Sequence, residues 1–345
     1  MLFRSALLSV TFWGIFAVGL RVSVIPPESC GAQGEQAIGR AATSAADWMI
    51  RNQLADGRYV YLYYPETDEI PSDYNEVRHA GVTMALYQAG GRLGSREALE
   101  AADRALAWMK ENLERHDGWA ALAPDGRRAK LGSSALMLVG LAERRLATHD
   151  PHYDALMVDL AEFLATMQRP DGGFHIGWDF TKDKPDTVGT SAYYPGEALW
   201  ALALTHEAFP DQRFDENARH ALEFITERRD EVEDIEFPPL ADQWAAYGIA
   251  EMIEWGLTDQ QIDYAERLAS RFGLLVRTES QREGSWYGQV LRGRIVHQEP
   301  AAGTPVRGRA RVSVVVSLGE EFSSVPALFG ESRRNALRGG RVARG

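Results

Sequence analysis

Four segments of the chain share one pattern, in which polar or aromatic residues precede a small residue and an apolar run follows it. The small residues are Gly81, Gly132, Gly196 and Ala245. Each segment lies downstream of a candidate helix and a turn, so the sequence predicts helical hairpins about 50 to 60 residues long, within the range of internal repeats. The four segments are residues 78–88, 130–143, 193–204 and 242–253.

More polar helices are expected between these four segments. Apolar residues recur there at helical spacing, which is typical of an outer helix with one buried face. Because short loops make neighbouring helices pack antiparallel, and no strand pattern interrupts the run, the sequence predicts an all-α layer or ring. The outer helices are expected at residues 36–51, 96–113, 153–167, 214–228 and 258–276.

The turns after the outer helices share a sequence pattern of Gln, Asp-Gly and an aromatic residue. Gly supplies the positive backbone angle, Asp can bond the adjacent backbone, and the aromatic ring packs the loop against its neighbours. Most of these residues are therefore expected to be structural. The turns occupy residues 53–59, 116–119, 168–174 and 281–286.

With these repeated turns, residues 40–290 resemble the (α/α) toroid proteins, which include six-hairpin glycosidases, polysaccharide lyases, uronyl epimerases and terpene cyclases. The resemblance implies an (α/α) toroid of antiparallel helical hairpins, with about five recognisable units and an incomplete C-terminal end. Several reactions occur on this ring, so the motifs specify architecture better than chemistry. The acidic motif of terpene cyclases is missing, and residues 231–234 are its nearest approach.

Charge and cysteine content exclude some partners. The formal net charge is −12, and residues 1–291 carry 45 acidic against 27 basic side chains, an excess of 18. Such a body repels phosphate backbones, which argues against nucleic acid as a partner. The single cysteine, Cys30, excludes an internal disulfide and a thiolate zinc cluster.

Residues 1–30 are expected to be a signal peptide or a membrane anchor. An apolar run over residues 6–20 is followed by Pro26 and Pro27. This run fits a signal-peptide core better than the roughly 20 residues of a spanning helix, although residues 5–25 together leave an anchor open. Both alternatives place the domain outside the cytoplasm, either exported to the periplasm or medium or tethered to a membrane.

The starts of the inner helices are the expected functional site. In a ring of hairpins, inner helices line a central cavity and their equivalent ends open at one mouth. Unpaired backbone N–H groups at helix starts favour an anion or a carboxylate-bearing ligand. The candidates at these starts are Tyr74, Asn75, Arg78, His79, Lys130, Tyr193, Tyr194, Glu197, Asp242, Gln243 and Trp244.

Glu197 is the expected general acid. Pro195 and Gly196 place it in the first turn of an apolar helix, where the helix dipole favours a carboxylate. Apolar neighbours would raise its pKa and suit it to donate a proton. Asp242 has the matching position one hairpin later and is the expected base, although capping its own helix is an alternative. Two such carboxyl groups are what glycoside hydrolysis needs.

His79 and Arg78 favour a different chemistry. His79 would abstract the proton next to a uronate carboxylate, as in lyases and epimerases, while Arg78 pairs with that carboxylate. The structural alternatives are an ion pair for Arg78 and a hydrogen-bonded position at a helix start for His79. Trp178 is expected either to stack on a sugar at the rim or to fill space between hairpins.

Residues 291–345 are expected to form an irregular, Arg-rich tail. Residues 292–345 contain ten arginines and no lysine or aspartate, with a β-branched run at residues 312–316 and Pro326 beyond it. Low order is expected from residue 331, and a frameshifted or otherwise non-native ending is one alternative.

The sequence therefore predicts a toroid domain over residues 31–290 that acts on a carbohydrate, in particular an acidic glycan, by acid/base chemistry. The reaction is hydrolysis or uronate lyase or epimerase chemistry. A non-catalytic glycan-binding or scaffold protein is the alternative, and a terpene cyclase-like enzyme a weaker one. No metal or cofactor is expected, because residues 175, 179 and 183 match no ligand pattern. The sequence leaves the sugar, the linkage and the oligomeric state open.

Overall fold

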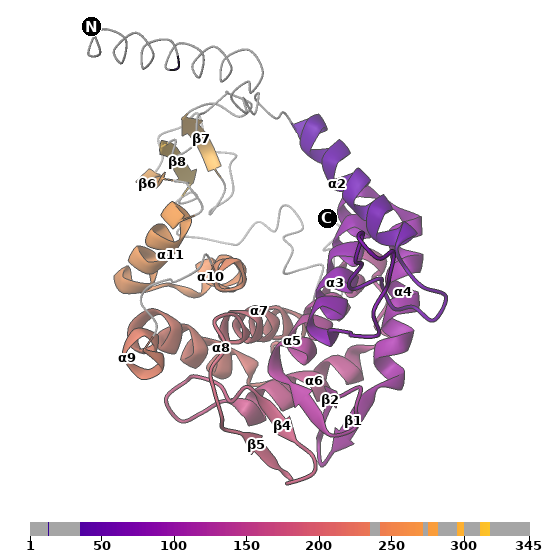
Figure 1. Ribbon diagram of the computed structural model, residues 1–345. Helices are drawn as coiled ribbons and strands as arrows, with labels where there is room; N and C mark the ends of the chain where they lie inside the picture. Colours follow the sequence, from indigo (N-terminus) through magenta and orange to yellow (C-terminus); the bar gives the residue numbers. More distant parts are fainter. Residues whose placement is uncertain are drawn as a thin grey trace, which may run out of the picture.

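The computed structural model describes Trp13, residues 35–234 and 242–271, and three strands at residues 275–281, 295–299 and 311–317. Four inner helices follow one another along an arc, and each packs against the next (Figure 1). Their starts lie within two residues of the starts of the four predicted segments. They are α3 (Glu76–Leu93), α5 (Leu131–Thr148), α7 (Tyr194–Ala208) and α10 (Gln243–Met252).

Outer helices return the chain between the inner ones, so the inner helices all run in the same direction. The predicted all-α fold of antiparallel hairpins is thereby confirmed. The last outer helix is shorter than predicted, because the chain becomes a strand at residue 275. The outer helices are α2 (Glu35–Arg51), α4 (Arg96–Glu111), α6 (Asp154–Met167), α8 (Phe214–Glu223), which continues through the π-helix η1 (Phe224–Arg228) into α9 (Arg229–Glu233), and α11 (Asp259–Arg271).

The two central helices are buried over most of their length. Every residue of α5 from Leu131 to Glu143 is buried, and in α7 only Tyr194 and His206 are partly exposed. A helix that is apolar around its whole circumference belongs in the interior, which explains why these segments lack the one-sided pattern of the outer helices. Polar side chains near the starts of these helices, such as Ser133, Ser134 and Glu197, are therefore buried.

Two of the four predicted turns, at residues 53–59 and 168–174, have the same geometry. The turn at residues 116–119 joins two short strands, and residues 282–286 lie outside the described residues. Gln53 Nε2 donates to the Ala101 carbonyl in α4 (2.8 Å), and Gln168 Nε2 donates to the Asn217 carbonyl in α8 (2.9 Å). The glycine four residues later has a φ of 89° in the first turn and 91° in the second, a left-handed conformation that favours glycine. Each of these two turns therefore fastens one hairpin to the next outer helix, as the sequence predicted.

Short strands fix the start of α5. The hairpin β1 (Leu113–His116) and β2 (Trp119–Leu122) follows α4, and a second sheet has the order β3-β4-β5. The Leu131 N–H donates to the Ile176 carbonyl (2.9 Å), which ties the first residue of α5 to the segment before β4. The second sheet consists of β3 (Arg128–Lys130), β4 (Gly177–Asp179) and β5 (Lys184–Asp186).

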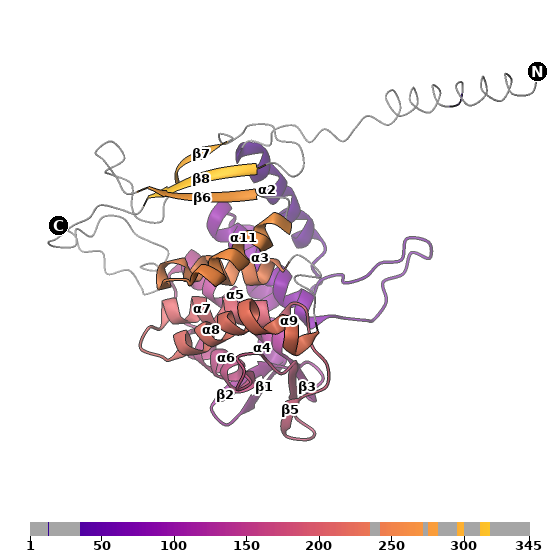
Figure 2. The same ribbon diagram turned by 90° about the vertical axis from the view of Figure 1, so that its left-hand side faces the viewer.

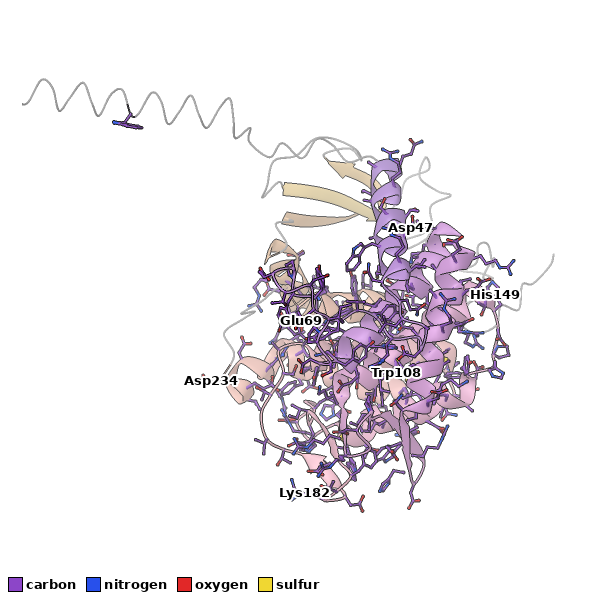
Figure 3. All side chains as sticks on the ribbon, turned by 45° about the vertical axis from the view of Figure 1, so that its right-hand side comes forward. Asp47, Glu69, Trp108, His149, Lys182 and Asp234 are labelled. Carbon is purple, nitrogen blue, oxygen red and sulfur yellow. The ribbon has the colours of Figure 1, made fainter. Side chains whose placement is uncertain are left out.

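Two loops project from the helical body. The loop between α2 and α3 extends outward, as Figure 2 shows, and it carries Glu69. Lys182 lies at the tip of the β4–β5 hairpin, whereas Trp108 lies within the body (Figure 3). Each of these loops precedes an inner helix in the sequence, α3 in the first case and α7 in the second.

After α11 the chain forms a sheet of order β6-β8-β7, in which β6 and β8 are parallel and β7 and β8 are antiparallel. This sheet crosses the boundary expected at residue 290. The predicted low order from residue 331 lies outside the described residues. The strands are β6 (Leu275–Gln281), β7 (Ile295–Glu299) and β8 (Arg311–Ser317).

Candidate functional site

The starts of the four inner helices form a continuous row. Lys130 Nζ lies 2.8 Å from Glu76 Oε1, which joins the starts of α5 and α3. Gly132 in α5 lies so close to Glu197 in α7 that a Cβ atom at position 132 would overlap the Glu197 carboxyl group. A Cβ atom at Gly196 would lie 2.8 Å from Asp242 Oδ1, so the start of α10 adjoins that of α7. The structure thus brings Lys130, Glu197 and Asp242 into one row.

Glu197 is a buried carboxyl group without a hydrogen-bond partner at Oε2. Its exposed fraction is 3%. Burial raises the pKa of Glu197 to about 8, and the negative charge of Asp242 adds to this effect. Glu197 therefore carries a proton at neutral pH, and no hydrogen bond within the described residues engages its Oε2 atom.

Asp242 is equally buried, but both of its carboxylate oxygens have donors. Oδ1 accepts the Ala245 N–H at the start of α10 (3.1 Å), and Oδ2 accepts from Arg229 Nη1 (3.3 Å). Burial raises the pKa of Asp242, while the Ala245 N–H and the Arg229 charge act in the opposite direction. The two neighbouring carboxyl groups therefore lie in different environments, one without a donor at Oε2 and one with a donor at each oxygen.

The Ser191 hydroxyl caps the first turn of α7, which begins at Tyr194. The N–H groups of Tyr193 and Tyr194 both donate to Ser191 Oγ, at 3.3 and 3.2 Å. The Tyr194 ring packs against Gly132, and burial, together with the charges of Glu197 and Glu76, raises the pKa of its hydroxyl to about 12. Tyr194 therefore lies between two carboxyl groups as a neutral hydroxyl.

Aromatic rings lie beside the carboxyl pair on α7 and α10. Trp244 stacks on Trp200 with 5.8 Å between ring centroids and 22° between planes. Tyr247, which is 48% exposed, lies 4.9 Å from Trp200. Gln243 is half-buried in the first turn of α10. Trp244 and Tyr247 offer the accessible part of this aromatic group.

Tyr74 and His79 lie on the other side of α3, against α4. The Tyr74 hydroxyl lies 2.6 Å from His79 Nδ1, and His79 Nε2 donates to the Ala105 carbonyl (3.1 Å). The imidazole also packs 4.5 Å from the Trp108 ring. Burial lowers the pKa of His79 to about 4, so the ring is neutral and fully engaged. The structure does not bring His79 to the carboxyl pair, and these contacts give it a structural role.

Arg78 lies at the solvent-exposed edge of the α3 start. Asn75 Oδ1 accepts the Arg78 N–H (3.0 Å) and caps the helix. The guanidinium lies 5.3 Å from the centroid of the Tyr61 ring and donates to the Tyr61 hydroxyl (3.3 Å). Lys130 is paired with Glu76, whereas Arg78 forms no ion pair with any residue that the structure describes.

Trp178 is a core residue. It lies in β4 with an exposed fraction of 8%, and its ring is 5.3 Å from Trp119 and 5.4 Å from His116. The expectation of a ring at the rim is therefore not met, because tertiary packing buries Trp178 against the β1–β2 hairpin. Of the two alternatives in the sequence, the space-filling one applies.

Arg229 is the site residue that sequence analysis missed. It is buried at 5% exposure and contacts Asp242, Glu233 and the carbonyls before α7. The signal in the sequence was weak, because Arg229 lies in a charged run that has the composition of a solvated loop. A basic residue just before an acidic run, within a helical hairpin, was the available clue.

Metal ligands and membrane spans are not found among the described residues. Within residues 36–234 and 242–269, no group of three or more His, Cys, Asp or Glu side chains is placed to hold a metal ion. None of the helices in the described part of the chain combines the length and apolarity needed to cross a bilayer. The predicted signal peptide or anchor at residues 1–30 lies outside the described residues, apart from Trp13.

The arrangement of inner and outer helices defines an (α/α) toroid. Similar solved structures are the cellobiose 2-epimerases of Bacillus thermoamylovorans B4167 and Spirochaeta thermophila DSM 6192. The Bacillus enzyme has a TM-score of 0.55 and 11% sequence identity, and the match covers 68% of this chain and 71% of that chain. The Spirochaeta enzyme has a TM-score of 0.51 and 16% sequence identity, and the match covers 68% of this chain and 69% of that chain.

An inactive variant of an alpha-1,6-mannanase of Salegentibacter sp. HEL1_6, in complex with alpha-1,6-mannotriose, is also similar. Its TM-score is 0.50 at 12% identity, over 67% of this chain and 85% of that chain. At these identities the likeness establishes the fold. No protein-family model and no curated protein matches the sequence.

Proposed function

We propose that the protein is a carbohydrate-active enzyme in which Glu197 is the general acid and Asp242 the general base. The observation that carries this proposal is the pair of buried carboxyl groups on adjacent inner-helix starts, one without a partner at Oε2 and one held by two donors. The toroid structures that resemble this chain act on sugars by name, as epimerases and as a mannanase, which supports the substrate class.

Glycoside hydrolysis needs one carboxylic acid and one carboxylate. Glu197, protonated at neutral pH, would give its proton to the glycosidic oxygen as the bond to the anomeric carbon breaks. Asp242 would take a proton from the water that adds to that carbon. After release of both sugars, Glu197 regains a proton and Asp242 loses one, so the pair returns to its starting state.

Substrate contacts are proposed for three side chains at the edge of the row. Trp244 and Tyr247 would stack on a sugar ring, because both are accessible and lie near the start of α10, the helix that Asp242 caps. Arg78, exposed and without a described carboxylate partner, would pair with the acidic group of a uronate. The substrate in this proposal is therefore an acidic glycan.

Epimerase or lyase chemistry is the second candidate, favoured by the likeness to cellobiose 2-epimerases. In that reaction Asp242 would remove a proton from the carbon next to a carbonyl or carboxylate, and Glu197 would supply a proton. His79 takes no part in this version, because both of its ring nitrogens are engaged between α3 and α4.

Incubation of the protein with neutral and acidic oligosaccharides tests the proposal. Hydrolysis releases reducing ends, a lyase generates the ultraviolet absorbance of an unsaturated uronate, and an epimerase incorporates solvent deuterium at the epimerised carbon. Glu197→Gln and Asp242→Asn should abolish turnover. Glu207→Gln, a buried position near the other end of α7, is the matched control and should retain activity. Glycan binding without turnover would instead identify a non-catalytic binding protein.

We also propose that residues 5–25 direct the domain out of the cytoplasm. The apolar run and the two prolines after it support this proposal. Expression of the full chain in a bacterium, followed by fractionation and N-terminal sequencing, distinguishes the alternatives. A shortened periplasmic product indicates a signal peptide, and a full-length product in the membrane fraction indicates an anchor. A full-length cytosolic product would contradict both.

A further inference from the structure

A chain of alternating charges, buried at its α10 end, leads from the turn after α6 to the start of α10. Arg169 Nε lies 3.1 Å from Asp171 Oδ1, and Arg169 Nη1 lies 3.8 Å from Glu233 Oε1. Arg229 Nε lies 3.0 Å from Glu233 Oε2, and Arg229 Nη1 lies 3.3 Å from Asp242 Oδ2. The side chains of Glu233, Arg229 and Asp242 are 2%, 6% and 4% exposed, so solvent screens these interactions weakly.

The guanidinium of Arg229 has a partner for each of its three nitrogens. Nε donates to Glu233, Nη1 to Asp242, and Nη2 to the carbonyls of Ser191 (3.0 Å) and Ala192 (2.8 Å). Ser191 also caps the first turn of α7 through its hydroxyl. One side chain therefore contacts both the residue that begins α10 and the segment that begins α7, which are the two elements that carry the carboxyl pair.

A π-helical turn aims this side chain inward. The Arg229 N–H donates to the Phe224 carbonyl five residues earlier, at the end of η1. One extra residue in a turn rotates all later side chains about the helix axis, and such turns are frequent at functional sites. The Phe224 ring lies 5.2 Å from the Arg169 guanidinium, so the same turn also packs against the other end of the charge chain.

We propose that Arg229 is the positioning residue of the site, which keeps Asp242 ionised and oriented beside the protonated Glu197, and that Glu233 and Arg169 hold Arg229 in place. This inference rests on the proposed function of the carboxyl pair. The groups that face Asp242 are Glu197 from α7, Arg229 from α9 and Tyr264 from α11. Arg229 is the cation in this set, so it carries the electrostatic support for a buried carboxylate.

The decisive experiment measures the ionisation of Asp242 directly. The full chain, labelled with ¹³C at its carboxyl carbons, is titrated by NMR, and Asp242→Asn and Glu197→Gln assign the two resonances. In Arg229→Gln the Asp242 resonance should titrate at least one pH unit higher, a tenfold change in its ionisation equilibrium. Arg229→Lys keeps the positive charge but lacks the planar guanidinium that bonds several acceptors at once, so a smaller shift of the Asp242 pKa in the same direction is expected. If Arg229→Gln does not fold, Arg229→Lys decides the question.

Arg145→Gln is the matched control. Arg145 also forms a two-pronged pair with an aspartate, Asp154, at 2.8 and 3.2 Å, between α5 and α6. This control should leave the Asp242 titration unchanged even where it lowers stability. An Asp242 resonance that titrates in a folded Arg229 variant as in the wild type, or an equal shift in the control, would overturn the positioning role.

Kinetics on a substrate from the glycan panel supply a second readout. Arg229→Lys should lower kcat at least tenfold with little change in KM, and the acidic limb of the pH profile should move to higher pH. A changed KM with an unchanged profile would contradict the inference. The carboxyl titration needs no substrate, so the absence of turnover on every glycan would refute the proposed function while the titration still tests Arg229.

Discussion

Replacement of Glu197 by Gln tests whether the buried carboxyl group holds its proton in the folded protein. Its pKa of about 8 in the fold, against 4.5 for the free side chain, means that the folded state keeps a proton that the unfolded chain loses. Stability is therefore fully present below pH 4.5 and decreases as the pH rises toward 8. Relative to its value at low pH, the free energy of unfolding is lowered through Glu197 by about 1 kcal/mol at pH 5 and by about 3 kcal/mol at pH 7.

Urea unfolding of the wild type and Glu197→Gln at these two pH values measures this penalty. The variant carries no titratable group at this position, so its stability relative to the wild type should increase by about 2 kcal/mol from pH 5 to pH 7. Comparison across pH removes the cost of burying the amide itself, which is the same at both values. In Asp242→Asn the pH dependence of Glu197 should shrink, because the neighbouring charge that raises its pKa is absent.

A stability difference that stays constant or reverses between pH 5 and pH 7 would refute this reasoning. It would mean that Glu197 is ionised in the folded protein at neutral pH. A carboxylate in that state has no proton to donate, and the acid role would have to move to another residue.

Three further substitutions follow from the contacts. Gly132→Ala should lower the free energy of unfolding by about 1–3 kcal/mol and reduce kcat, because the new methyl group overlaps the Glu197 carboxyl group. The control Gly39→Ala, with no atom within 4 Å of its Cβ, should be neutral or stabilising. Equal melting temperatures for the two variants would contradict this prediction. His79→Asn should flatten the loss of stability between pH 6.5 and about 4, where the folded wild type keeps its imidazole neutral, and should leave kcat per folded molecule unchanged. A large drop in kcat would restore a catalytic role to His79. Arg78→Ala should raise KM about tenfold for an acidic glycan and leave a neutral one unaffected; equal effects on both would remove the carboxylate contact from the proposal.

The inner helices could be predicted because their local signals agree with the final packing. Pro195 and Gly196 start α7 where the sequence indicates, and the buried Glu197 that follows lies in its first turn. Asp242 caps α10 through the Ala245 N–H and still contributes to the row, so the capping and site interpretations are compatible. The Gln and glycine turns at residues 53–59 and 168–174 could be predicted for the same reason, because residues close in sequence set their geometry.

Other features depend on contacts that no local pattern encodes. The burial of Trp178 arises from the β1–β2 hairpin, and the hydrogen bond of His79 Nε2 arises from α4; both elements are distant in sequence. Arg229 reaches Asp242 because of a π-helical turn, whereas helical periodicity assumes 3.6 residues per turn. Strand β6 begins at residue 275, one residue before the predicted end of the last outer helix, and it is paired with a strand more than thirty residues later in the sequence.

A crystal structure of Glu197→Gln with a bound oligosaccharide would show whether a sugar binds at the carboxyl pair. We expect a sugar at the common start of α3, α5, α7 and α10. Its glycosidic oxygen should lie within hydrogen-bond distance of the side chain at position 197, and its ring should lie against Trp244 or Tyr247. A sugar bound only at the opposite end of the inner helices, in the cavity of about 480 Å³ lined by Gln88 and Glu143, would contradict it.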